Sequence, residues 1–486
     1  MKRKVLGLSL VMLLFIVMAA ACAVPAVEAP APEIAQAPEA PADTGTDPVT
    51  LRILDWKDST LAQRHVFHDY FMSRHPHVTI EYTSVTVDQF RTSIVTMLRA
   101  GDAPDIFPTP GGITMAMTLN EGWYQALSPL VTDEFLASIN PAVFVEGQTT
   151  RNGVVYTLPE LLPMVSTLFY YNRDLLDASG IDELPATFSE FLDAARRITE
   201  VGNGQFFGII DGGRQLNRLN ELARTLTWMG GGKIAHAHMA LTVDGRAPYD
   251  TPEMIAALEF INQLVVDGSF HPDTVNINAP EAREIFAQGQ AAFISQGVWC
   301  IGPWAADHPE LNFGVMAPPR PDAATASFMA APVVAAGVGI YLNSEIPHIA
   351  AQYMMALYSE EYGYQIDCVA AGVFASIVLG INERHMEHPV SLRYFELNQE
   401  LTIAIPVAAQ RNEDVFDFYV EVIDVQPNLA AIVQGILAGA VPDIPGYLTA
   451  FADASTVEWQ RASDAIGLDF AAFEFPNWIP GVPYSH

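Results

Sequence analysis

The chain has 486 residues, of which half are hydrophobic and a tenth are aromatic, so it can bury a large core. It carries 24 Lys+Arg against 56 Asp+Glu, a formal net charge of −32. A surface this acidic repels phosphate backbones, which argues against binding of nucleic acid. The length is sufficient for two or three ordinary domains.

The N-terminus has the pattern of an export leader. Cations at positions 2–4 precede an apolar run at 5–18, and small residues then lead to Cys22. A cationic start, a short apolar stretch and small residues before a cut site are typical of a signal peptide, here residues 1–21. The apolar run is too short to cross a membrane comfortably after cleavage.

Small residues that end at a cysteine resemble a bacterial lipobox, in which Cys22 would receive lipid and become the mature N-terminus. The following segment, 22–48, is rich in Ala, Pro and acidic residues, which predicts an extended tether. We therefore expect a protein outside the cytoplasm, held to the cell membrane by a lipid anchor. The alternative is ordinary signal cleavage near by, with Cys22 removed or unmodified.

The body begins with alternating strands and helices. The predicted elements are, in order, a strand over 49–56, a helix over 61–75, a strand over 78–85, a helix over 88–99 and a short strand at 105–110. Proline after His75 stops the first helix, and Gly101 ends the second. This order predicts a parallel or mixed sheet with helices on its faces.

The same pattern restarts in the second half of the chain. Thr187 and Glu190 form a capping box, and Thr251 caps a helix that has proline at its first position and Gly268 at its end. Strands are predicted at 206–210, 291–295 and 312–316, and helices at 349–367, 427–437 and 448–465. Two α/β units with a helical tail indicate two lobes.

Four segments resemble one family. They are MLRAGDAPDIF, EGWYQALSPL, the stretch GVVYTLPELLPMVSTLFYYNRDLLDASGI with LPATFSEFLDAARRI, and IFAQGQAAFISQGVW. In this order and spacing they are similar to the extracellular solute-binding proteins of family 1, the maltose-binding-protein-like lipoproteins that serve carbohydrate ABC transporters. The resemblance covers roughly residues 50–470.

The resemblance implies an α/β, two-lobed periplasmic-binding-protein fold (type II-like), in which hinge strands join two sheets flanked by helices. The implied lobes are 49–160 with 333–374, and 164–328 with 378–486. The implied hinges are Leu161–Met164, Phe328–Pro332 and Phe374–Ile377. The solute would lie between the lobes, where domain interfaces and strand ends favour ligand sites.

A sugar site needs flat aromatic platforms and polar groups at the ring edges. The candidate ligand contacts are Trp299, Trp56, Asp58, Glu160, Trp304, Arg214, Asn217 and Trp228. The GVW segment matches the family position at which an aromatic ring stacks on sugar, so Trp299 is the first candidate. A place in the core is the alternative for each tryptophan, and it is the favoured one for Trp228.

The other candidates are chosen by their place in the chain. Trp56 and Asp58 follow the first strand, and Glu160 stands at the first crossover. Arg214 and Asn217 are expected in the loop after the strand FFGII of the second lobe. Carboxylates, amides and guanidinium groups at these positions could bind hydroxyls.

We expect no cofactor, no metal and no catalytic residues. The pairs His236/His238 and His65/His68 have no carboxylate at metalloenzyme spacing, and no nucleophile or phosphate-loop motif occurs. Cys300 and Cys368 could pair in an oxidising compartment, but two buried thiols are favoured.

The resemblance implies a monomeric binder that delivers a sugar or oligosaccharide to an ABC permease. Three alternatives remain open: a non-sugar solute such as a polyol, glycerophosphodiester, polyamine or oligopeptide; a ligand sensor; and a surface glycoside hydrolase. A hydrolase would need two carboxylates about 5–10 Å apart across the scissile bond.

Overall fold

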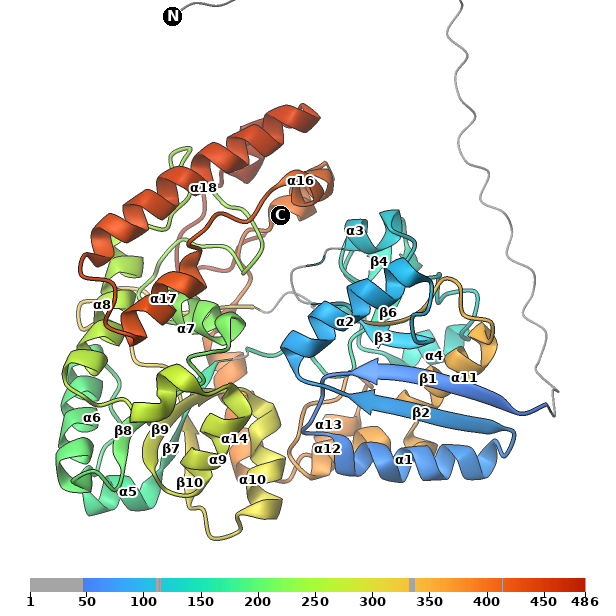
Figure 1. Ribbon diagram of the computed structural model, residues 1–486, viewed down its shortest axis with the longest axis horizontal. Helices are drawn as coiled ribbons and strands as arrows, with labels where there is room; N and C mark the ends of the chain where they lie inside the picture. The colour runs from blue at the N-terminus through green and yellow to red at the C-terminus, as the bar shows by residue number, and fades with distance from the viewer. Residues whose placement is uncertain are drawn as a thin grey trace, which may run out of the picture. The chain divides into compact units, whose positions relative to one another are not determined.

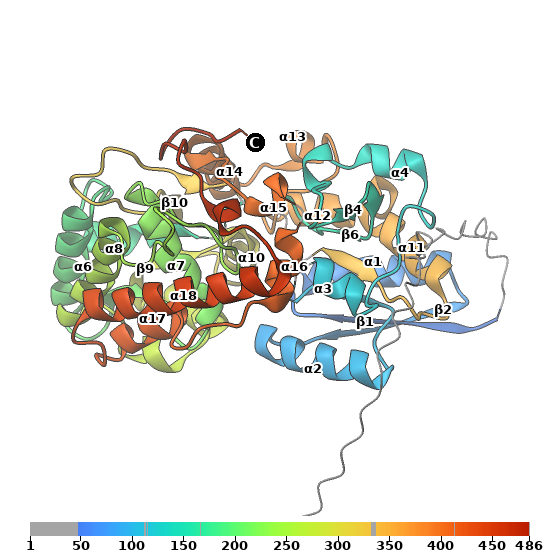
Figure 2. The ribbon, with the colours of Figure 1, turned by 90° about the horizontal axis from the view of Figure 1, so that it is seen from above.

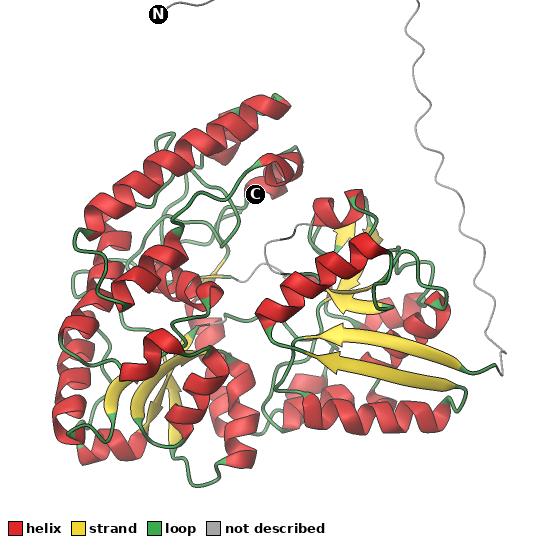
Figure 3. Ribbon diagram, in the orientation of Figure 1, coloured by secondary structure: helices red, strands yellow, loops and turns green. Residues whose placement is uncertain are grey.

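The computed structural model describes residues 47–110, 113, 115–165, 167–331, 337–412 and 414–485. The predicted leader and Cys22, most of the tether and part of the second hinge lie outside the described residues. Two separate sheets organise the described body, each with helices on its faces (Figures 1 and 3). This confirms the predicted fold class.

The first sheet has the strand order β2-β1-β3-β12-β6. Its strands are β1 (Val49–Asp55), β2 (Val78–Ser84), β3 (Ile106–Pro108), β6 (Thr157–Leu158) and β12 (Val338–Ile340). Strand β1 runs parallel to β2 and β3, whereas β12 is antiparallel to β3 and β6. The chain therefore returns to this sheet after it has built the second one.

Two helices cover opposite faces of β1 and β2 (Figure 2). Phe67 and Phe71 of α1 (Leu61–Arg74) are buried in one core cluster, and Phe90 and Ile94 of α2 (Val87–Ala100) in another. The other helices around this sheet are α3 (Met115–Asn120), α4 (Asp133–Ser138), α11 (Pro347–Tyr358), α12 (Tyr364–Ala370) and α13 (Ile381–His385). A short hairpin joins β4 (Thr150–Arg151) to β5 (Val154–Val155).

The second sheet has the order β10-β7-β9-β8. Its strands are β7 (Leu168–Asn172), β8 (Phe207–Ile210), β9 (Ala291–Gln296) and β10 (Phe313–Met316). Strand β7 is antiparallel to both neighbours, and β8 is parallel to β9. Around it lie α5 (Arg173–Ala178), α6 (Phe188–Gly202), α7 (Leu216–Met229), α8 (Pro252–Val266), α9 (Ala279–Ala287) and α10 (Ile301–Asp307).

The C-terminal helices extend the part of the molecule around the second sheet, as the red ribbons of Figure 1 show. They are α14 (Pro389–Leu401), α15 (Ala408–Arg411), α16 (Val415–Glu421), α17 (Leu429–Leu437) and α18 (Ile444–Ile466). Helix α17 packs on α7 and α8, and α14 packs on β10. Strand β11 (Met329–Ala330) pairs with β13 (Thr402–Ile403), which connects the segment after β10 to the C-terminal helices.

Several local predictions are confirmed. Thr187 and Glu190 form the capping box of α6, and the Thr251 side chain caps α8. The single helix predicted over 349–367 is wrong: α11 ends at Tyr358 and α12 begins at Tyr364. Ser359 after α11 is extended, with ψ 136°, and Gly363 before α12 has φ +75°, so the backbone leaves the helical conformation at two residues between the helices.

We use the names first lobe and second lobe for the regions around the first and the second sheet. The exact lobe and hinge boundaries remain predictions. None of the helices in the described residues is both long and apolar enough to cross a membrane.

Candidate functional site

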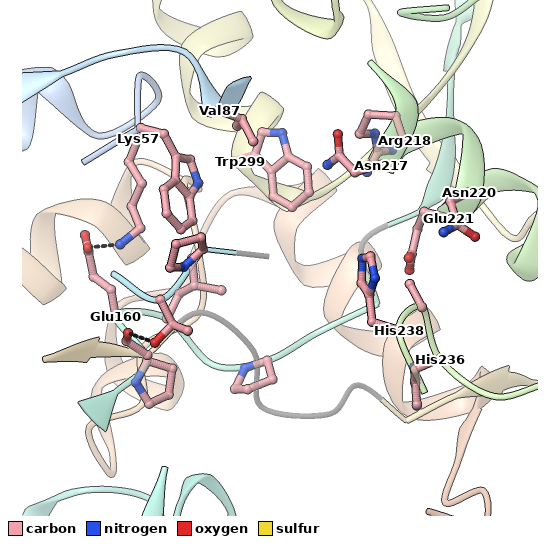
Figure 4. Close-up of a pocket in the computed structure, with 18 of the residues that line it drawn as sticks. Lys57, Val87, Glu160, Asn217, Arg218, Asn220, Glu221, His236, His238 and Trp299 are labelled. Atoms are coloured by element: carbon pink, nitrogen blue, oxygen red, sulfur yellow. Dashed lines mark hydrogen bonds and ion pairs between the residues drawn. The ribbon is translucent and has the colours of Figure 1, made fainter. Parts of the chain in front are cut away.

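A pocket of about 1100 Å³ is lined by residues from both lobes (Figure 4). From the first lobe it takes the residues that follow β1 and the start of α2. From the second lobe it takes the first turns of α7 and the residues that follow β9. The crossover segments contribute as well, at 159–165, 329–330 and 373–374. The pocket therefore lies where strand ends and chain crossovers meet, which is where binding sites of α/β proteins occur.

The end of β1 supplies the first wall. Trp56, Lys57 and Asp58 follow the strand directly and all line the pocket. The Trp56 ring is partly exposed and meets Phe90 of α2 edge to face, with 4.6 Å between ring centroids. Helix α2 thus holds the Trp56 ring in place while part of it remains accessible to a ligand.

Lys57 leads from this wall into a buried ionic cluster around Glu160. Both Glu160 oxygens are engaged: Oε2 accepts from Lys57 Nζ, and Oε1 accepts from the Tyr364 hydroxyl and from Arg64 Nη2, the last at 2.5 Å. Asp55 Oδ2 lies 3.6 Å from Lys57 Nζ and 3.8 Å from Arg64 Nη2. Glu160 is only 3 % exposed, so it makes its bonds inside the protein.

The charges in this cluster are mutually compensated. Burial by itself raises the pKa of Glu160, but Arg64 and Lys57 outweigh burial and hold that pKa at about 2. Burial and the charge of Arg64 lower the pKa of the neighbouring His68 to about 3. At neutral pH Glu160 is therefore an anion with donors on both oxygens, and His68 is neutral.

Hydrogen bonds from the same cluster connect two of the segments in which the chain crosses between the lobes. The Glu160 carbonyl accepts from Gln365 Nε2 at 3.2 Å, and Gln365 Oε1 accepts from the Ser376 hydroxyl at 2.6 Å. The backbone N–H of Leu162 donates to the Ala375 carbonyl at 2.7 Å. The first and third predicted hinges thus run side by side beneath the pocket.

The second wall is built at the end of β9. Gln296 ends the strand, and Gly297 leads into the short turn Val298–Cys300 that carries Trp299. A Cβ atom at Gly297 would lie 2.2 Å from the Trp299 ring, so only glycine lets the indole lie against the backbone here. The ring is partly exposed and lines the pocket.

Arg218 of α7 lies between Trp299 and β9. Its guanidinium carbon is 5.7 Å from the Trp299 ring centroid, and its Nη2 donates to the Ser295 carbonyl at 3.1 Å. Arg218 is 5 % exposed and Gln296 is fully buried, yet both line the pocket. Among the described residues, Gln296 Nε2 has no hydrogen-bond acceptor.

Of the predicted contacts, Trp299, Trp56, Asp58, Glu160, Asn217 and Trp228 line this pocket. Asn217 is exposed, and it stands in the first turn of α7 rather than in a loop. The loop prediction was wrong because the helix begins at Leu216, only six residues after β8, and its apolar face is buried in the core. Asp58 accepts from Arg283 Nη2 of α9 at 2.7 Å, which joins the two lobes.

Three predicted contacts are placed differently from the prediction, since two are buried and one lies outside the lining of the pocket. Trp228 lines the pocket but is 2 % exposed, and its Nε1 donates to the Ile234 carbonyl at 2.9 Å. Trp304 is 4 % exposed and packs edge to face on Tyr170, 5.1 Å between centroids. Arg214 is exposed and is absent from the described lining of the pocket.

Some lining residues were not predicted. Lys57 carried a signal, because only one other lysine, Lys233, occurs beyond residue 48. Arg91, Arg218 and Gln296 carried none, since single polar residues in helices and strands are ordinary in any sequence. Their role in the lining follows from how the helices and strands pack.

Within the described residues no three His, Cys, Asp or Glu side chains come together as metal ligands would. Cys300 and Cys368 are buried free thiols. Burial raises the pKa of the Cys300 thiol to about 11, so it is protonated at neutral pH.

Solved structures share this fold. An ABC transporter solute-binding protein from Thermotoga lettingae, bound with α-D-tagatose, is 20% identical, with a TM-score of 0.66 over 84% of this chain and 99% of that one. The Listeria monocytogenes ABC substrate-binding protein Lmo0181, in complex with cycloalternan, is 16% identical, with a TM-score of 0.64 over 87% and 100%. The chain therefore has the two-lobed fold of these proteins.

The sequence specifies the family within that fold. Residues 58–364 match the family described as bacterial extracellular solute-binding protein, and the chain belongs to this family. A Brucella abortus relative, provisionally described as a binding protein, is 23% identical over 252 residues, which are 51% of this chain. The match spans 57% of that relative's length.

Proposed function

We propose that this protein is the extracytoplasmic substrate-binding component of an ABC importer. It would capture a sugar or oligosaccharide in the pocket between the lobes and deliver it to the permease. Family membership supports a binding protein. The observation that favours a sugar as the ligand is the pair of partly exposed indoles, Trp56 and Trp299. They line one pocket of about 1100 Å³ together with charged and amide side chains.

Physical chemistry favours a sugar at such a site. The C–H faces of a pyranose ring are apolar and pack on indole, while its hydroxyls need donors and acceptors around the edge. Of the eight ligand contacts suggested by the sequence, we propose four: Trp299, Trp56, Asp58 and Asn217. Micromolar affinity requires only about 8 kcal/mol, which such contacts can supply without covalent chemistry. We propose no catalytic activity.

The test is a thermal-shift screen of mono-, di- and oligosaccharides, because a ligand that binds only the folded state raises its melting temperature. We expect a concentration-dependent rise with at least one sugar. The same plates carry polyols, glycerophosphodiesters, polyamines and peptides. If one of these compounds raises the melting temperature and no sugar does, the proposed ligand would be that class of solute instead of a sugar.

The leader supports a second proposal, that the mature protein is anchored through lipid on Cys22. The family resemblance supports a third, that the protein acts as a monomer. Mass spectrometry of the N-terminus of protein from its native membrane should show a lipidated Cys22. An intact Met1, or an unmodified N-terminus beyond Cys22, would contradict the anchor. Light scattering of the soluble body tests the monomer.

A further inference from the structure

Cationic side chains make up a larger share of the charged residues in the pocket than in the chain. Acidic residues outnumber basic ones by 56 to 24 in the sequence, whereas the lining of the pocket has six carboxylates and four cationic side chains. The cationic side chains are Lys57, Arg91, Arg218 and Arg283. An acidic surface repels anions, so cations gathered in a recess have a local role in binding.

Most of the carboxylates in the lining already have donors from the chain itself. Glu160 is held by Lys57 and Arg64, and Asp58 by Arg283. Glu146 accepts from the backbone N–H of Asn152 at 2.6 Å, and Glu281 accepts from that of Asn278 at 2.7 Å. The charges of Glu160 and Asp58 are thus offset by cations before a ligand arrives, whereas Glu146 and Glu281 have oxygens satisfied by neutral backbone donors.

Arg91 differs from Lys57 and Arg283, which both have carboxylate partners. It stands on α2 in the first wall and makes no ion pair with a carboxylate of the described residues. Its Nε is buried and has no hydrogen-bond acceptor among those residues. A guanidinium is always charged and is a donor at every nitrogen, so Arg91 presents unused donors to the pocket.

The second wall also presents donors. Gln296 Oε1 faces the Cys300 thiol, 3.8 Å from Sγ, which leaves the Nε2 amide group for the pocket. Arg218 beside it carries a guanidinium fixed by the Ser295 carbonyl and the Trp299 ring. A buried donor without an acceptor is costly, so a fully buried Gln296 Nε2 in the lining points to an acceptor group on the ligand.

We propose that the ligand is an acidic sugar, one in which a uronate carboxylate replaces the neutral hydroxymethyl group, and that Arg91 and Arg218 select it. This inference rests on the proposed function, since it names the kind of sugar. A carboxylate only accepts hydrogen bonds and can take two from one guanidinium. A hydroxymethyl group carries no charge and needs an acceptor for its own proton, so it gains less than a carboxylate does from the guanidinium groups and from Gln296 Nε2.

The test uses matched pairs of sugars that differ only at C6: glucose with glucuronate, galactose with galacturonate, and mannose with mannuronate. Each is measured as the monosaccharide and as the linked trimer by isothermal titration calorimetry at low and high NaCl. We expect at least one uronate to bind about tenfold or more tightly than its neutral partner, as charge-assisted hydrogen bonds allow. Salt should weaken the binding of that uronate and leave its neutral partner unchanged.

Two variants locate the effect. Arg91→Met removes the charge in the pocket, and Arg99→Met removes the same charge from an exposed position of the same helix outside the pocket. Arg91→Met should weaken uronate binding about tenfold and leave the neutral partner within twofold. Arg99→Met should change neither. If Arg91→Met does not fold, the salt dependence of the unaltered protein still decides the question.

The outcomes separate this inference from the function on which it rests. Neutral sugars that bind as tightly as their uronates would overturn the acidic ligand and leave the sugar-binding function in place. A uronate preference that survives Arg91→Met would overturn the role of Arg91. Failure of every sugar to bind would overturn both.

Discussion

The two walls of the pocket satisfy their polar groups in different ways. In the first wall every charge of the Glu160 cluster has a partner of opposite sign and both carboxylate oxygens accept hydrogen bonds, while Arg64 Nε has no acceptor among the described residues. In the second lobe the buried polar atoms that have no partner among the described residues include Gln296 Nε2, which lines the pocket, and Asp211 Oδ2. A complete network stabilises the fold, whereas an incomplete one costs stability unless another molecule completes it.

Asp211 in the second lobe illustrates how a buried polar group without a partner costs stability. It follows β8, is 1 % exposed, and accepts only the backbone N–H of Gly212, at 2.7 Å. Burial raises its pKa from 3.8 to about 6, although the charge of Arg218 acts in the opposite direction. Glu160 has the opposite shift, from 4.5 to about 2. Two buried carboxyls, one in each lobe, therefore respond to pH with opposite sign.

The largest expected effect comes from Glu160→Gln. The change keeps the size of the side chain and removes its charge, so Arg64 and Lys57 lose the anion that compensates them. Breaking a buried ion pair in this way costs roughly 3–5 kcal/mol of the free energy of unfolding, measured by urea denaturation. The matched control is Glu400→Gln, in the exposed pair with Arg393, which should cost about 1 kcal/mol or less.

A loss below about 1 kcal/mol for Glu160→Gln would mean that the first wall is not held by its charges. The two walls would then differ in composition only.

The next prediction compares two tryptophans of the second lobe. Trp304→Ala removes a buried ring and should lower the free energy of unfolding by roughly 3–5 kcal/mol. Trp299→Ala removes a partly exposed ring, so it should cost less stability but weaken sugar binding by about 1–3 kcal/mol. Calorimetry and thermal melting on both variants separate the two roles. A large melting loss with unchanged affinity in Trp299→Ala would place that ring in the core instead.

Asp211→Asn tests the sign of the pH effect. The folded state holds the Asp211 proton more tightly than the unfolded state does, so ionisation destabilises the protein above about pH 6. The cost is absent below about pH 3.8, where the carboxyl is protonated in both states. Asn keeps the acceptor for Gly212, so the variant should be more stable at pH 7 by up to roughly 3 kcal/mol. The advantage should disappear by pH 4.

Glu160 supplies the contrast in the same denaturation series. Its folded pKa is depressed, so its contribution is present above about pH 4.5 and is lost as the pH falls toward 2. Asp211→Asn should retain this acid loss, and Glu160→Gln should lack it. An Asp211→Asn variant less stable than the parent at pH 7 would show that the Asp211 charge stabilises the second wall.

The smallest expected effect on stability comes from Gln296→Leu. It replaces a buried amide whose Nε2 has no described acceptor, so the free energy of unfolding should change by less than about 1 kcal/mol, or rise. Binding of the sugar found in the screen should weaken at the same time. Stability lost with binding retained would mean that Gln296 belongs to the fold of the second wall rather than to the site.

Local chemistry made much of the fold predictable. The strand ending before Trp56, the capping box of Thr187 and Glu190, and the Thr251 cap each depend on a few neighbouring residues. The predicted helix over 349–367 was too long because nothing in the local sequence marked the extended Ser359, and the left-handed Gly363 was not recognised as a break. The site was only partly predictable, since polar residues of α2 and α7 give no local signal of what they face.

The sequence by itself determined the leader pattern, the alternation of strands and helices, the family, and the aromatic residue of the GVW segment, because each is encoded by residues close together in the chain. Only the tertiary structure decided that Lys57 meets Glu160 across 103 positions, that Asp58 meets Arg283 across 225, and that Trp304 belongs to the core. Partners so distant meet only when the crossovers bring the strand ends of both sheets to one pocket. Burial and pairing there set each charge, and neither can be read from a residue's neighbours in sequence.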